Sequence, residues 1–158
     1  MPAIAYIALG SNLGDREKNL KTAFALMQER GIRIRRVSSF YRTAPYGVTD
    51  QPDFLNAACE AEWDGDPESL LHTLLRIELD MGRERKRHWG ERNIDLDLIL
   101  FGDAVIHSRD LTLPHPDMAN RSFVLEPLAE IAPRAVHPFL HRTIGELWEA
   151  LKNRGDAD

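Results

Sequence analysis

The strongest indication of fold lies at residues 93–100, which read NIDLDLIL. Apolar residues alternate there with two aspartates, which is the period of a strand whose side chains point in turn to opposite faces. We therefore expect a strand over 94–101. The residues expected to face the core are Ile94, Leu96, Leu98 and Leu100. Asp95 and Asp97 then share the other face, about 7 Å apart along the backbone.

This carboxylate pair has two interpretations. Two ionised carboxylates at that spacing repel each other, and aspartate is disfavoured inside strands, so a compensating cation is expected. A pair of divalent metal ions fits, because such ions take oxygen ligands and can bridge phosphates. The alternative is an exposed edge strand on which Asp95 and Asp97 only add solubility.

Turn and cap residues divide the rest of the chain into alternating elements. The expected strands cover 3–9, 32–41, 54–63 and 94–101. One helix begins at Asp15 and ends near Gly31, and a second begins at Asp66-Pro67 and ends at Gly82. The order β-α-β-β-α-β predicts an α+β fold, the ferredoxin-like split β-α-β sandwich, whose antiparallel sheet carries both helices on one face.

A helical extension is expected after this core. Residues 122–131 have helical composition, with Pro127 as a kink or a start. Thr143 and Glu146 match a capping box that would open a last helix. This C-terminal segment, together with loops, would cover the second face of the sheet or leave it open as a site.

Length and charge limit the function classes. The chain has 158 residues, which fits a single domain over 1–158, and a formal net charge of −5, which disfavours nucleic acid and membrane surfaces as partners. The lone cysteine, Cys59, excludes an internal disulfide, and the N-terminus does not resemble a signal peptide. We expect a cytoplasmic protein.

Three polar features surround the aspartates. The loop 83–93 carries five basic residues against two acidic ones, which fits a polyphosphate clamp but also a solvated surface. His115, held between Pro114 and Pro116, could bind a phosphate or ribose, or could simply form a turn. Asn56 lies in an apolar strand and could pair with the edge of a heterocycle or be structural.

The chain resembles the 6-hydroxymethyl-7,8-dihydropterin pyrophosphokinase family, enzymes of folate biosynthesis. The resemblance covers about residues 3 to 140, and its most specific parts are the R-x-x-D-L-D and L-x-P-H-P-x-M segments. The stretches that carry it are ALGSNLG (8–14), SSFYRT (38–43), DQPDFLNAA (50–58), RIE (76–78), GR (82–83), WGERNIDLD (89–97) and LPHPDM (113–118).

The resemblance implies transfer of pyrophosphate from ATP to a pterin hydroxymethyl group by a monomer, with AMP released. Asp95 and Asp97 would hold two Mg²⁺ ions, and Arg83 and Arg92 would be catalytic. The implied ATP-binding residues are Glu78, Arg83, Arg85, Trp89, Arg92, Leu98 through its backbone, Thr112, His115 and Arg121. The implied pterin-binding residues are Thr43, Ala44, Tyr46, Gly47, Phe54, Asn56, Trp89, Asp95 and Phe123.

Some positions depart from the commonest family pattern, and two other functions stay open. The departures are Ala44, Phe54, Asp110 and Pro116, none of which replaces a carboxylate of the 94–101 strand. One alternative is a different nucleotide-dependent enzyme on the same sheet. The other is a non-catalytic RNA-binding module, although such sheets expose aromatic residues where Asp95 and Asp97 stand here.

Overall fold

A computed structural model describes residues 2–43, 53–82 and 93–154. Its main sheet consists of β1 (Ala3–Ser11), β2 (Arg33–Val37), β3 (Tyr41–Thr43), β4 (Phe54–Trp63) and β5 (Asp95–Phe101). The strand order is β2-β4-β1-β5, and β3 pairs with β4; every pairing is antiparallel. This is the expected split β-α-β arrangement.

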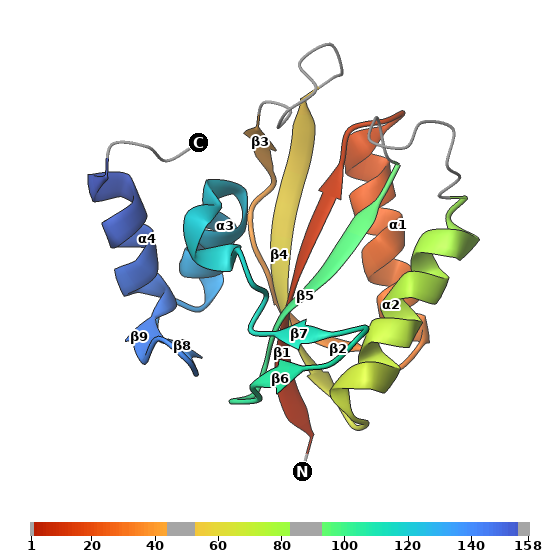
Figure 1. Ribbon diagram of the computed structural model, residues 1–158. Coiled ribbons are helices and arrows are strands. Elements are labelled where there is room, and N and C mark those ends of the chain that lie inside the picture. Colours follow the sequence, from red (N-terminus) through yellow and green to blue (C-terminus); the bar gives the residue numbers. More distant parts are fainter. Residues whose placement is uncertain (1, 44–52, 83–92, 155–158) are drawn as a thin grey trace.

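Helices cover both faces of this sheet (Figure 1). The first core lies between the sheet and α1 (Arg16–Glu29) and α2 (Pro67–Asp80), which are the two helices of the split β-α-β units. The second core lies between the other face and the C-terminal helices α3 (Ser122–Ile131) and α4 (Ile144–Asn153). The C-terminal extension therefore covers the second face of the sheet, which is one of the two arrangements expected from the sequence.

The short elements complete the chain. A small hairpin pairs β6 (Ile106–His107) with β7 (Thr112–Leu113), and a 3₁₀ turn, η1 (Met118–Asn120), precedes α3. A second hairpin pairs β8 (Val136–His137) with β9 (Arg142–Thr143) before α4. Within the described ranges, the structure contains no helix long and apolar enough to cross a bilayer.

Local sequence chemistry explains where the helices begin. The side chains of Asp15 and Asp66 accept hydrogen bonds from the backbone N–H groups of Lys18 and Ser69, so both expected N-caps are confirmed. The capping box of Thr143 and Glu146 is also present at the start of α4. Pro127 lies inside α3 and is buried there.

Two expectations about strands are wrong. The strand expected over 32–41 is divided into β2 and β3, because the Ser38 hydroxyl, in place of a backbone carbonyl, accepts the N–H of Ala58. Leu100 does not face the same core as Leu96 and Leu98. The β1–β5 register shifts between Tyr6 and Ile7, and this bulge turns Leu100 toward the second core.

Candidate active site

The two aspartates lie at the start of β5, on the sheet face that carries α3 and α4. Asp97 is paired with Ala8, which belongs to the second core, and Asp95 is paired with Gly10. Asp97 is exposed and Asp95 is half-buried. The intervening Leu96 points into the first core. Both carboxylates therefore belong to one face, beyond the part of the sheet that the C-terminal helices cover.

His115 lies beside this pair because the bulge in β5 offers it a backbone partner. The His115 N–H donates to the Ile99 carbonyl at 2.9 Å. Burial lowers the pKa of His115 below its usual 6.5, although the Asp97 charge acts in the opposite direction. The imidazole is thus mainly neutral at pH 7. Its Nδ1 atom is buried and, within the described part of the chain, has no hydrogen-bond partner.

Arg121 adds a cation near His115 at the start of α3. Its guanidinium forms an ion pair with Asp117 at 3.4 Å, and its charge contributes to lowering the pKa of His115. The same guanidinium lies 5.7 Å from the ring centre of Phe123. A positive group, a neutral imidazole and two carboxylates thus come from three separate chain segments.

The second half of the site is built around Asn56 on β4. Asn56 is buried, and its Nδ2 group donates a short hydrogen bond to the Thr43 hydroxyl on β3. A Cβ atom on Gly10 would lie 2.9 Å from the Asn56 Oδ1 atom and 3.5 Å from the Phe54 ring. Gly10, Phe54 and Asn56 therefore share the face of the sheet that carries the aspartates.

Sequence reasoning missed the position of Gly10. The first strand was expected to cover only 3–9, but β1 continues through Ser11, and Gly10 lies between Asn56 and Asp95 in the ladder. The lack of a side chain at Gly10 leaves room for the Asn56 amide oxygen close to the strand. The only signal in the sequence was a glycine directly after an apolar strand, which is equally typical of a turn.

Glu78 lies on the first-core side of the sheet, opposite the face that bears Asp95 and Asp97. It belongs to α2, and its buried carboxylate accepts the backbone N–H of Leu96 at 2.7 Å. Asn93 binds the Met81 carbonyl near the same place, so the end of α2 is joined to the start of β5. This arrangement supports the backbone between the two aspartates.

The remaining candidates are distributed as follows. The Leu98 side chain is buried in the first core, so only its backbone is available to a ligand. Thr112 is half-buried on β7, and Phe123 packs partly against the second core. The candidates that lie outside the described residues are Ala44, Tyr46, Gly47, Arg83, Arg85, Trp89 and Arg92.

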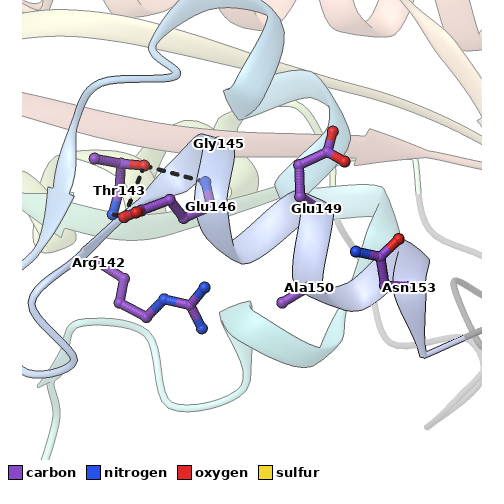
Figure 2. A pocket seen from close by; sticks show the side chains of 7 residues that line it. All are labelled: Arg142, Thr143, Gly145, Glu146, Glu149, Ala150 and Asn153. Carbon is purple, nitrogen blue, oxygen red and sulfur yellow. Dashed lines mark hydrogen bonds between the residues drawn. The ribbon is translucent and has the colours of Figure 1, made fainter.

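An open surface hollow of about 550 Å³ lies elsewhere, along α4 (Figure 2). It includes the capping box, in which the Thr143 hydroxyl accepts the Glu146 N–H and the Glu146 carboxylate accepts the Thr143 N–H. None of the predicted site residues lines it. Its polar groups already satisfy the helix end, so the carboxylate face is the better candidate site.

The family model and the similar proteins found by comparison point to the same family. The family model described as 7,8-dihydro-6-hydroxymethylpterin-pyrophosphokinase matches residues 6–133. The chain is 47% identical over 135 residues to 2-amino-4-hydroxy-6-hydroxymethyldihydropteridine pyrophosphokinase of Haemophilus influenzae, covering 85% of this chain and 84% of the relative. It is 48% identical over 132 residues to the Bacillus subtilis protein of the same name, covering 83% of this chain and 79% of the relative.

Longer proteins contain the same unit. The chain is 44% identical over 155 residues to the mitochondrial folate synthesis bifunctional protein of Pisum sativum, which covers 92% of this chain but only 30% of that protein. A crystal structure of Plasmodium falciparum HPPK-DHPS has a TM-score of 0.80 at 18% identity, covering 98% of this chain and 46% of the other, and supports the fold alone. The match to the family model and the bacterial relatives show that this chain belongs to the 7,8-dihydro-6-hydroxymethylpterin-pyrophosphokinase family.

Proposed function

We propose that this pyrophosphokinase of folate biosynthesis transfers the β,γ-pyrophosphate of ATP to the hydroxymethyl group of 6-hydroxymethyl-7,8-dihydropterin. The hydroxyl oxygen forms a bond to the β-phosphorus, and the bond from that phosphorus to the oxygen bridging the α-phosphate breaks. AMP leaves with the bridging oxygen, and the hydroxyl proton is released. The observation that carries this proposal is the single sheet face that bears Asp95 and Asp97 at one side and the Asn56–Thr43 pair at the other.

Asp95 and Asp97 are the proposed holders of two Mg²⁺ ions. Their donor set fits the metal, because Mg²⁺ prefers oxygen ligands and is commonly bound by one or two carboxylates together with phosphates and water. Within the described residues no group of three or more His, Cys, Asp or Glu side chains could hold a metal ion. Phosphate and water would supply further oxygen ligands to Mg²⁺ at Asp95 and Asp97. Bound Mg²⁺ would neutralise charge on the phosphate oxygens.

The other roles proposed for the protein's side chains are to position the substrates and to stabilise charge on the phosphates. Neutral His115 can donate a hydrogen bond to a phosphate or ribose, and Arg121 can balance phosphate charge. The roles proposed for Arg83 and Arg92 are catalytic, since fixed cations stabilise charge that shifts during phosphoryl-type transfer.

The proposed pterin contacts rest on one buried amide. Asn56 offers both donors and an acceptor, as an edge of a pterin requires. Its hydrogen bond to Thr43 fixes which way the amide points, and Phe54 occupies the same face two residues earlier. Phe54 and Phe123 are the proposed aromatic contacts of the ring.

The organisation of the protein is also a proposal. We take residues 1–158 as one domain that acts as a monomer, and size-exclusion chromatography with light scattering tests its oligomeric state. The cytoplasm is the proposed compartment, which the single cysteine supports, since Cys59 is a buried free thiol.

The experiment for this function measures AMP release from ATP with and without the pterin. The proposal predicts AMP only when ATP, Mg²⁺ and the pterin are all present. A chain that releases AMP at the same rate without the pterin would have a different acceptor. Asn56→Ala should weaken pterin binding much more than binding of an ATP analogue, because a buried edge loses its partner.

A further inference from the structure

The carboxylate of Glu130, near the end of α3, binds a segment about 90 positions away in the sequence. One oxygen, Oε1, accepts the Ser39 N–H at 2.9 Å and the Tyr41 hydroxyl at 2.6 Å. The other, Oε2, accepts the Ser39 hydroxyl at 2.9 Å. Three donors from one short segment thus meet a single side chain, and Figure 1 shows α3 lying beside β3, which contains Tyr41.

The ionisation of these groups agrees with the geometry. Burial and the bond to Glu130 raise the pKa of Tyr41 to about 12, so the phenol stays protonated as a donor. The Tyr41 hydrogen bond is also the main reason why the pKa of Glu130 is lowered. Glu130 is therefore an anion at neutral pH, and its hydrogen bonds are charge-assisted.

The segment that Glu130 binds leads directly to the proposed pterin contacts. In the β3–β4 ladder Tyr41 is paired with Asn56, and Thr43, two residues later, accepts the hydrogen bond of the Asn56 amide. β3 is three residues long and pairs, within the described chain, only with β4. A strand this short has few bonds of its own to define its position, so a second attachment matters.

We propose that Glu130 is a positioning residue for the pterin substrate. It fixes β3 against α3, so that Thr43 and Asn56 on the sheet keep a constant placement relative to Phe123 on the first turn of the same helix. This inference rests on the proposed function for Thr43, Asn56 and Phe123. It assigns to Glu130 no contact with either substrate.

The helix itself does not depend on this carboxylate. Val124, Leu125, Leu128 and Ile131 are buried in the second core. Arg36 on β2 also donates to the Ile131 carbonyl at 2.9 Å and so caps the same helix end. Glu130 is exposed, so its removal leaves no cavity. The expected effect is therefore a looser β3 rather than a lost fold.

The test compares Glu130→Ala with a matched control, Arg36→Met, which removes a polar contact to the same helix end without touching β3. Glu130→Ala should raise the KM for the pterin about 5- to 30-fold, while the KM for ATP and kcat change less than about 2-fold. Glu130→Gln keeps one acceptor oxygen and should show a smaller rise. Arg36→Met should leave both KM values unchanged.

A double-mutant cycle tests the hydrogen bond between Tyr41 and Glu130 by changing both partners. Tyr41→Phe should raise the KM for the pterin in the wild-type background and add little to Glu130→Ala, because the two side chains share one interaction. Independent, additive effects would overturn the inference. So would a Glu130→Ala variant in which the KM values for both substrates rise equally, as expected for a purely structural residue.

The Asn56→Ala variant distinguishes a failure of the Glu130 inference from a failure of the proposed pterin pocket. If Asn56→Ala weakens pterin binding and Glu130→Ala does not, the pterin pocket stands and the role of Glu130 is refuted. If Asn56→Ala leaves pterin binding intact, the pocket itself is wrong and the inference falls with it. Circular dichroism and urea unfolding of each variant establish that the compared proteins are folded.

Discussion

Replacing Gly10 with alanine should damage the pterin site through a single methyl group. The new Cβ atom would lie 2.9 Å from the Asn56 Oδ1 atom and 3.5 Å from the Phe54 ring. Ordinary carbon–oxygen contacts are at about 3.3 Å or more, so the amide oxygen has to move by a few tenths of an ångström. Asn56 is 5% exposed and its Nδ2 group is bound to Thr43, so the amide has little room to move.

The size of the effect follows from how this conflict is relieved. Forcing an extra methyl group into a packed site costs about 1–3 kcal/mol. Turning the Asn56 amide away instead leaves a buried polar group without its partner, at a similar cost of about 1–3 kcal/mol. Either route displaces the group proposed to read the pterin edge. The affinity for the pterin should therefore fall about 5- to 150-fold.

Isothermal titration with the pterin and, separately, with a non-hydrolysable ATP analogue measures this effect. Gly145→Ala is the control, because its added Cβ is also tightly placed, at 3.2 Å from the Pro133 carbonyl oxygen, but lies in the first turn of α4 and not in the proposed site. It should change stability alone. A Gly10→Ala protein that binds the pterin as wild type does, with unchanged urea unfolding, would refute this account of Gly10 and Asn56.

Three further predictions concern other parts of the structure. Asp97→Asn should lower turnover about 10²- to 10³-fold while the free energy of unfolding is maintained, and unchanged Mg²⁺-dependent turnover would exclude a metal role. Burial lowers the pKa of His137 below 6.5. The free energy of unfolding should therefore decrease as the pH is lowered from about 7.5 to about 5.5, because the unfolded state takes up a proton there and the folded state does so only at lower pH. His137→Asn should reduce this pH dependence of the unfolding free energy, measured by urea unfolding. An unchanged pH dependence would contradict the role given to His137. Thr143→Ala removes the capping box and should cost about 1 kcal/mol of stability by thermal unfolding, with AMP release per folded molecule unchanged; a selective loss of activity would show that α4 has a catalytic role.

The elements that sequence could predict depend on neighbouring residues. Asp15, Asp66 and Thr143 form caps with groups only three residues away, and each was expected from the residue types alone. The period-two pattern of β5 likewise puts Leu96 and Leu98 in the first core, facing away from the aspartates. Local rules were sufficient for these features.

The features that sequence could not predict depend on distant partners. The bulge in β5 involves β1, and its Ile99 carbonyl binds His115 in a later segment. The division of β2 from β3 depends on the bond between Ser38 and Ala58. No periodicity in either segment encodes these contacts, since each requires that the sheet already be assembled.

The candidate site shows the same contrast. Asp95, Asp97, His115 and Asn56 were identified from residue type and from family resemblance, but the closeness of His115 to Asp97 needed the fold. Gly10 and Glu130 were not identified, because their importance lies in what they meet across the sheet and at α3. The resemblance also named Arg83 and Arg92, which lie outside the described residues.

Pyrophosphate transfer is tested most directly by following the β-phosphorus of ATP. The purified chain is incubated with Mg²⁺, the pterin and ATP radiolabelled at the β-phosphorus, and the products are separated by chromatography. Pyrophosphate transfer moves the label to the pterin as a diphosphate ester, with one unlabelled AMP formed for each. Label retained in ADP, with a single phosphate on the pterin, would contradict pyrophosphate transfer.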